Sequence, residues 1–232
     1  MKKLLIYLMI LCIFFSFVAC SRFGEDVTAP SSKDPIEIDT EKEPIEFETA
    51  DISDWVIYWY LCGSDLESSS GYATIDLAEL MEVTLPQNVK VVIQTGGSTT
   101  WYNDVVDASK LQRFVYDSEG LELVDEQPLA SMGDVQTLYE FLYFAKTNYP
   151  ADKTAVIFWN HGGGSVYGAA FDELYGFDSL TLDEMYAAFY NVWDLSEENP
   201  PLELIGFDTC LMATVDVAAT FSDIAQYMVA SE

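Results

Sequence analysis

Basic side chains are scarce in this 232-residue chain, which has 10 Lys and Arg residues against 39 Asp and Glu residues and a formal net charge of −29. Nucleic-acid binding depends on Lys and Arg side chains that displace counterions from phosphates, so this deficit argues against that class of protein. An acidic surface is instead expected to attract basic peptides or divalent cations. The sequence therefore predicts no nucleic-acid partner.

Cysteine and histidine are also rare, with four cysteines and one histidine, His161. Cys12 and Cys20 lie in an apolar N-terminal segment, which leaves Cys62 and Cys210 for the rest of the chain. Two cysteines do not make a disulfide framework, so we expect the fold to be stabilised by its apolar core. Cys62 lies inside a predicted strand, where we expect it to be a small buried apolar residue.

Residues 1–20 carry two lysines followed by an uncharged apolar run, which is the pattern of a secretory signal peptide. The run ends in Phe17-Val18-Ala19-Cys20 and resembles a bacterial lipobox, in which Cys20 is lipidated, although Phe17 is not the usual residue at its position. An ordinary secretory leader and an uncleaved anchor are the alternatives. We predict an extracytoplasmic protein of the bacterial cell envelope, held to the membrane by a lipid anchor.

Residues 21–50 are rich in Asp, Glu and Pro and poor in large apolar side chains, which predicts an acidic disordered tether. Strand and helix patterns alternate over residues 51–232 and predict one α/β domain, with a mostly parallel sheet flanked by helices on both faces. The chain stops at Ser231-Glu232, directly after a predicted strand. We therefore expect this domain to be the N-terminal part of a longer one.

The predicted elements follow one another along residues 51–232. Strands are expected at 56–61, 89–94, 154–161, from 202 to about 210, and at 227–230, and helices within 66–83 and at 133–147, 182–193 and 215–221. Residues 111–115 and 121–124, separated by the turn sequence DSEG, predict a β-hairpin that projects from the main sheet.

Two of the predicted strands end in residues that can carry chemistry. The strand TAVIFWNH ends at His161 and is followed by Gly162-Gly163-Gly164, and the strand LELIGFDTC ends at Cys210. Parallel strands present their carboxyl ends at one edge of a sheet, where ligands bind in open α/β folds. A thiol and an imidazole that meet there form the pair expected of a cysteine nucleophile and its histidine base. Asn160 should point away from His161 and stabilise the turn.

Other groups near these strand ends could support the same chemistry. The backbone N–H groups of Gly162 and Cys210 are candidate donors to an oxyanion, and glycine permits close approach of the main chain or a positive φ. A helix expected to begin about Ala213 would favour the thiolate. Asp208 lies two residues before Cys210, on the same face if the strand continues, and it suits a positively charged substrate side chain. Capping of the following helix is the alternative role for Asp208.

Two further patterns point elsewhere. The sequence HGGG is similar to the oxyanion-hole motif of some lipases, but the chain has no G-x-S-x-G elbow and no second histidine to serve as a base, so a serine esterase is not supported. Asp172, Glu173 and Asp178 form an acidic loop whose spacing does not match an EF-hand, and we expect solvated charge there and no metal site.

FWNHGGG, LIGFDTCLMATVDVA and YMVASE together resemble the clostripain family of cysteine peptidases, and WVIYWYLCGSDLE is similar to that family's first strand and the loop after it. The resemblance covers about residues 54–232 and implies a caspase-like fold with an inserted β-hairpin. It implies that Cys210 is the nucleophile, that His161 is the general base and acid, and that the Gly162 N–H is an oxyanion donor.

The resemblance also implies that Asp208 and Ser231 bind substrate, with Asp208 in the pocket for an arginine or lysine before the scissile bond. The implied protein is a secreted or lipid-anchored cysteine endopeptidase that acts on peptides with basic residues through an acyl-enzyme. No cofactor is required, although calcium is compatible with the family and with the acidic composition. Residues 162–209 contain no Lys or Arg, which excludes self-processing there after a basic residue. The alternative is a non-catalytic surface-binding lipoprotein that retains the fold.

Overall fold

A computed structural model of the chain describes residues 36–41, 52–195 and 200–232. The predicted signal peptide, its candidate lipidation residue Cys20 and most of the predicted tether lie outside these ranges. Within the described ranges, no helix has both the length and the apolar character that a membrane crossing requires.

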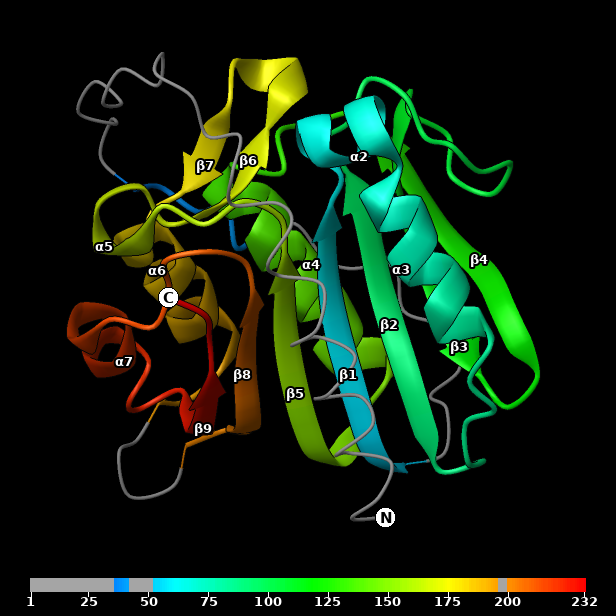
Figure 1. Cartoon of the computed structure of the whole chain (residues 1–232). Helices are drawn as coiled ribbons and strands as arrows, with labels where there is room; N and C mark the ends of the chain where they lie inside the picture. Colours follow the sequence, from blue (N-terminus) through cyan, green and yellow to red (C-terminus); the bar gives the residue numbers. More distant parts are fainter. Residues whose placement is uncertain (1–35, 42–51, 196–199) are drawn as a thin grey trace.

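Parallel strands form the centre of the fold (Figure 1). Each is an apolar segment, as expected when both faces of a sheet are buried. They are β1 (Ser53–Cys62), β2 (Val89–Gly96), β5 (Ala151–Trp159), β8 (Leu202–Asp208) and β9 (Ala225–Val229). Because β1 pairs with β2 and β5, and β8 pairs with β5 and β9, all in parallel, their carboxyl ends lie at one edge.

A β-hairpin of β3 (Lys110–Asp117) and β4 (Gly120–Pro128) completes a seven-stranded sheet with the order β4-β3-β2-β1-β5-β8-β9. The hairpin prediction is confirmed, but the expectation that it projects from the main sheet is wrong, because β3 pairs antiparallel with β2. The reason is burial on both faces of β3. Leu111 and Val115 pack into the core on one side of the sheet, and Phe114 and Tyr116 pack into the core on the other.

Helices cover both faces of the sheet, as the sequence predicted (Figure 1). One face carries α4 (Val135–Asn148), α6 (Leu182–Val192) and α7 (Val215–Thr220), and the other carries α2 (Ser64–Ser70) and α3 (Tyr72–Met81). Side chains that alternate along β1 divide between the two layers. Tyr58 and Tyr60 pack on Phe141 of α4, whereas Ile57 and Leu61 belong to the cluster beneath α3.

The segment between β5 and α6, which the sequence predicts to be loop, contains short elements of secondary structure. It consists of α5 (Gly164–Tyr167), β6 (Ala169–Asp172), the short 3-10 helix η2 (Glu173–Tyr175) and β7 (Asp178–Leu180), with β6 and β7 antiparallel. The prediction of solvated charge is wrong for Asp172, which is fully buried and accepts hydrogen bonds from the backbone N–H of Met132 and Leu174, both at 2.8 Å. Burial raises the pKa of Asp172.

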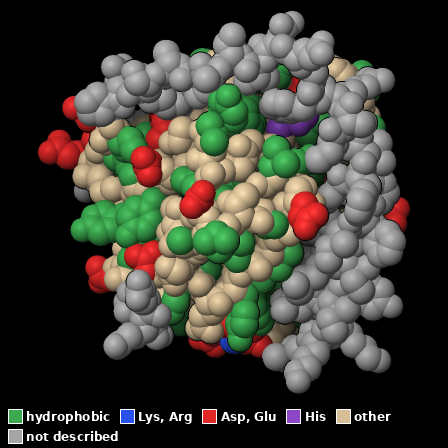
Figure 2. Space-filling view, turned by 60° about the vertical axis from the view of Figure 1, so that its left-hand side comes forward, with side chains coloured by type: hydrophobic (Ala, Val, Ile, Leu, Met, Phe, Trp, Pro, Cys, Tyr) green, Lys and Arg blue, Asp and Glu red, His purple; other side chains and the backbone are tan. Residues whose placement is uncertain are grey.

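The described basic side chains are largely engaged by carboxylates. Ion pairs join Lys90 to Asp117, Lys110 to Glu126, Lys153 to Glu203, and the buried Arg113 to Asp125, at 2.8 to 3.0 Å. Among the described residues that Figure 2 shows in colour, Asp and Glu side chains appear at several places and Lys and Arg side chains hardly at all. The visible described part of this face thus carries more acidic than basic side chains.

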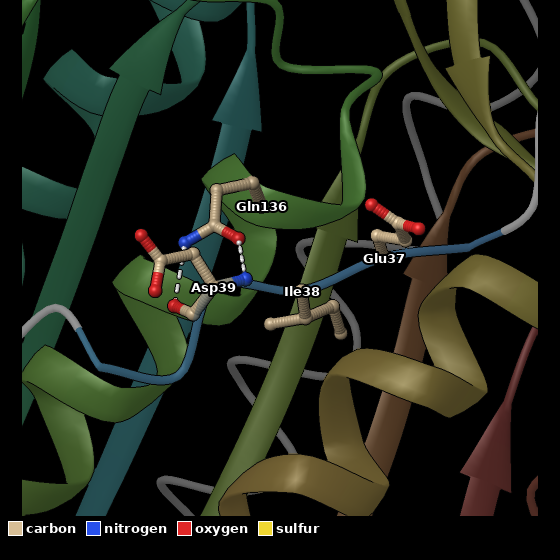
Figure 3. Close-up of a pocket in the computed structure, with 4 residues that line it drawn as sticks. All are labelled: Glu37, Ile38, Asp39 and Gln136. Carbon is tan, nitrogen blue, oxygen red and sulfur yellow. Dashed lines mark hydrogen bonds between the residues drawn. The ribbon is translucent and has the colours of Figure 1, made fainter.

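Part of the predicted tether lies against the domain. The backbone of Asp39 exchanges two hydrogen bonds with the side-chain amide of Gln136 in α4, one from Asp39 N–H to Oε1 at 2.8 Å and one from Nε2 to the Asp39 carbonyl at 3.2 Å (Figure 3). Ile38 packs against the core, and Glu37, Ile38, Asp39 and Gln136 line a shallow pocket. The remainder of residues 21–50 lies outside the described ranges.

The contact of Asp76 in α3 with Trp159 at the end of β5 allows a test of how α3 packs on the sheet. Its carboxylate accepts a 2.6 Å hydrogen bond from Trp159 Nε1, and burial raises its pKa from 3.8 to about 6. Since the folded-state pKa is the higher one, the carboxylate destabilises the fold as pH rises from 3.8 to about 6, and the penalty is complete above that range. Two pKa units correspond to about 3 kcal/mol, which partial solvent exposure reduces to about 1–2 kcal/mol.

Asp76→Asn keeps an acceptor for Trp159 and removes the charge. Chemical denaturation at pH 7.5 should show the variant to be about 1–2 kcal/mol more stable than the parent, and the difference should vanish near pH 4. Asp104→Asn, at an exposed position, is the matched control and should leave the stability unchanged at both pH values. A difference for Asp76→Asn that is equal at both pH values would contradict this account.

Candidate active site

His161 and Cys210, the two residues that the sequence predicts to carry the chemistry, follow neighbouring strands. β5 and β8 pair in parallel, with Trp159 opposite Asp208 in the last paired position. The Asn160 N–H then donates to the Asp208 carbonyl at 3.4 Å. His161 is the second residue after the end of β5, and Cys210 is the second residue after the end of β8. Both residues therefore lie at the same edge of the sheet.

Backbone contact between the two loops brings them together. A Cβ atom added to Gly162 would lie 1.9 Å from the Cys210 carbonyl oxygen and 2.7 Å from Thr209 Oγ1. Only glycine allows this approach, because a Cβ atom does not come within 3.0 Å of such neighbours. Close approach, which was one of the two predicted reasons for glycine here, is therefore what Gly162 provides, and the neighbouring main chain is that of Cys210.

His161 has a partner that the sequence analysis missed. Its Nε2 lies 2.7 Å from Oδ1 of Asp65, in the first turn of α2. The His161 side chain is buried and its ring meets the edge of Phe171 at a centroid distance of 6.4 Å. The hydrogen bond with His161 lowers the pKa of Asp65, which keeps this carboxylate ionised. The available signal was position, since Asp65 comes three residues after the end of β1, whose carboxyl end reaches the same edge.

Asn160 ties this edge together, which confirms its predicted role in the turn. Its Nδ2 donates to the Cys62 carbonyl at the end of β1, and its Oδ1 accepts from the Phe171 N–H in β6, both at 2.7 Å. Two segments, the end of β1 and β6, are thereby fixed to one side chain immediately before His161.

The two described cysteines occupy different environments. Cys62 is fully buried and its thiol donates to the Phe171 carbonyl at 3.4 Å, and burial raises its pKa, so it is the inert apolar residue that was predicted. Cys210 is 9% exposed and is followed by Leu211, which has φ +64°. A nucleophilic Cys210 would be the reduced thiol.

Asp208 and Ser231 lie at the same edge of the sheet as Cys210, because they stand at or just after the ends of parallel strands. Asp208 is the half-buried last residue of β8, and Ser231 follows β9 with its carbonyl accepting a 2.9 Å hydrogen bond from the Ala213 N–H. This bond joins the loop after Cys210 to the segment after β9.

The structure corrects two expectations about Asp208. The strand ends at Asp208, so strand alternation does not place the Asp208 and Cys210 side chains on one face. The next helix begins at Val215, close to the start expected about Ala213, and the Thr214 hydroxyl caps it by accepting from the Val217 N–H. The cap is thus Thr214, and Asp208 does not fill that role.

Over the described part of the chain, His, Cys, Asp and Glu side chains do not gather in threes or more in a way that could hold a metal ion. The described groups at this edge include an imidazole, carboxylates, a cysteine sulfur and backbone N–H groups. This set suits acyl transfer from a carbonyl to sulfur.

Comparison with known proteins agrees with this geometry. Residues 59–232 match the model of the clostripain family. Clostripain of Hathewaya histolytica is 35% identical over 95 residues, which cover 38% of this chain and 18% of clostripain.

Solved structures share the fold. A secreted C11 cysteine protease from Bacteroides thetaiotaomicron, in complex with an irreversible peptide inhibitor, superposes with a TM-score of 0.59 at 21% identity, covering 76% of this chain and 48% of that one. An inactive zymogen C11 protease from Parabacteroides distasonis gives a TM-score of 0.56 at 18% identity, covering 78% of this chain and 49% of that one. The chain thus spans about half the length of these proteins. The fold is that of the C11 proteases, and the chain belongs to the clostripain family.

Proposed function

We propose that this chain carries the catalytic residues of a cysteine endopeptidase that cleaves peptide bonds after arginine or lysine. The observation that carries the proposal is the contact of Gly162 with the Cys210 carbonyl, which joins the histidine loop to the cysteine loop at one edge of the sheet. Family membership favours the same chemistry.

In the proposed reaction the reduced Cys210 gives its proton to His161, and the thiolate attacks the carbonyl carbon of the scissile peptide bond. The N–H groups of Gly162 and Cys210 stabilise the oxyanion of the tetrahedral intermediate. His161 then protonates the leaving amine, which departs and leaves a thioester on Cys210. Water attacks the thioester with His161 as base, which releases the carboxylic acid product and restores the thiol.

Substrate preference rests on charge. The Cys210 loop begins after Asp208 at the end of β8 and is hydrogen-bonded, through Ala213, to Ser231 after β9. These two residues are proposed to bind the substrate residue before the scissile bond. A carboxylate there favours Arg or Lys, and the net charge of −29 attracts basic peptides over a longer range.

The proposed location is outside the cytoplasm, at the bacterial cell envelope, with Cys20 as the lipidated residue. The signal-like pattern of residues 1–20 supports secretion. One structural neighbour is described as a secreted protease, which agrees with export.

The first prediction concerns the nucleophile. In the full-length protein, under reducing conditions, an arginyl or lysyl electrophile should label the parent, and Cys210→Ala should abolish labelling and lower kcat/KM by more than about a thousandfold. Cys62→Ala, which removes the other described cysteine, should still be labelled. Equal labelling of Cys210→Ala and the parent would favour the alternative, a non-catalytic surface-binding lipoprotein.

The second prediction concerns Asp208. Asp208→Ala should lower kcat/KM for peptides with a basic residue before the scissile bond by about 30- to 1000-fold, since a charge pair buried with substrate is worth roughly 2–4 kcal/mol. Alkylation of Cys210 by iodoacetamide, which carries no charge to recognise, should change by less than about threefold. Losses of the same size in both assays would assign Asp208 a structural role.

The third prediction concerns metal ions. Thiol, imidazole and backbone N–H groups supply every step proposed above, so we expect peptidase activity to persist in excess EGTA. Calcium, which the acidic composition would attract, is the ion to test. Activity that is lost in EGTA and restored by added calcium would establish a calcium requirement.

A further inference from the structure

The single histidine of the chain is held by a carboxylate from another element. Nε2 of His161 lies 2.7 Å from Oδ1 of Asp65, and the two side chains are 8% and 44% exposed respectively. An ionised carboxylate can only accept hydrogen bonds, so in this contact Nε2 carries the hydrogen. A neutral imidazole held in this way has its basic lone pair on Nδ1.

We propose that Asp65 is a positioning residue that fixes the ring orientation and tautomer of His161, so that Nδ1 exchanges the proton with Cys210. This inference deepens the proposed function and rests on it. Asp65 does not touch the reacting atoms in this account. It acts by holding one nitrogen of the ring and by stabilising the imidazolium that forms when Cys210 becomes a thiolate.

The backbone around Asp65 is built to hold the carboxylate in place. Ser64, immediately before it, is fully buried with φ +51°, a left-handed conformation that costs a non-glycine residue about 1–2 kcal/mol. The Ser64 carbonyl accepts a 2.9 Å hydrogen bond from Ser98 Oγ, which anchors this turn. The strained turn redirects the chain from β1 into α2 and places Asp65 over the edge of the sheet.

A second carboxylate anchors the rest of α2. Glu67 is fully buried and accepts hydrogen bonds from the N–H of Thr74 at 2.8 Å and of Tyr102 at 2.7 Å. These bonds tie α2 to α3 and to the loop after β2. Asp65 is thus presented by a fixed support, as a positioning residue requires.

Among the described residues, the other ionisable groups on the elements around this pair have hydrogen-bond partners of their own or are buried. Glu173 of η2 accepts from Ser68 Oγ of α2 at 3.0 Å and from the Thr99 N–H at 2.6 Å, and the buried Asp172 of β6 accepts from Met132. Cys62 at the end of β1 is buried with its pKa raised. Cys210 follows β8. Asp65 contacts the ring directly.

The test compares Cys210 alkylation by iodoacetamide at pH 6 and pH 9 in the reduced full-length protein. At pH 6 an ordinary thiol, with a pKa near about 8.5, is almost unreactive, so alkylation there reports the thiolate–imidazolium pair. Asp65→Asn should slow alkylation about tenfold or more at pH 6 and less than about twofold at pH 9. It should also lower kcat by about 10- to 1000-fold with KM within about threefold, since tautomer and orientation act in the transition state.

Matched variants separate positioning from folding. Asp183→Asn makes the same change at an exposed first-turn position of α6 and should leave both assays unchanged. Asp65→Glu keeps a carboxylate and should retain alkylation at pH 6 within about fivefold of the parent. Equal slowing of Asp65→Asn at both pH values, or none, would overturn the inference, and so would equal losses in Asp65→Glu and Asp65→Asn.

The alkylation assay needs no substrate, so it tests the inference even if the peptidase assignment fails. An unlabelled parent in the arginyl-electrophile assay would overturn the proposed function. If the parent is labelled and Asp65→Asn is alkylated as fast as the parent at both pH values, only the role of Asp65 would be overturned.

Discussion

The parallel pairing of β5 with β8 is the constraint on which the rest of the site depends. Its last paired residues, Trp159 and Asp208, set how far each strand extends, and therefore where His161 and Cys210 emerge. A shift of the register by one residue would turn each side chain to the opposite face of the sheet. The aromatic core resists such a shift, because Phe158 stacks on Phe207 at 5.5 Å between the two strands.

Backbone strain is concentrated where the loops meet. Ser64, Ala170 and Leu211 all have left-handed φ, and they adjoin Asp65, the β6 segment beside His161, and Cys210 respectively. Each such residue costs roughly 1–3 kcal/mol, and strain of this kind persists only where the surroundings over-determine it. Here the surroundings are the buried hydrogen bonds of Asn160 and the contact of Gly162 with Cys210.

Much of the scaffold could be predicted from the sequence, because apolar strands and amphipathic helices are local patterns. The edge that bears His161 and Cys210 followed from strand ends, which are also local. Asp65 was missed because it lies in the first turn of a helix of only seven residues, where no periodicity distinguishes a functional carboxylate from a solvated one. The placement of the β3–β4 hairpin and the burial of Asp172 depend on long-range partners, which local patterns do not encode.

The acidic composition opposes the chemistry that we propose, and the local arrangement has to overcome that opposition. A chain with net charge −29 disfavours any further negative charge, including a thiolate at Cys210. Asp65 adds negative charge to the neighbourhood, yet it contacts the ring of His161, and in the proposed reaction the proton that this ring takes from Cys210 gives the compensating positive charge for the sulfur. In this proposal the carboxylate of Asp65 assists the thiolate through the ring, whereas Asp208, close to the cysteine in sequence, is proposed to attract a cationic substrate. Two carboxylates near one sulfur can thus have different roles. Asp65 acts on the sulfur through the imidazole that lies between them, and Asp208 acts on the substrate.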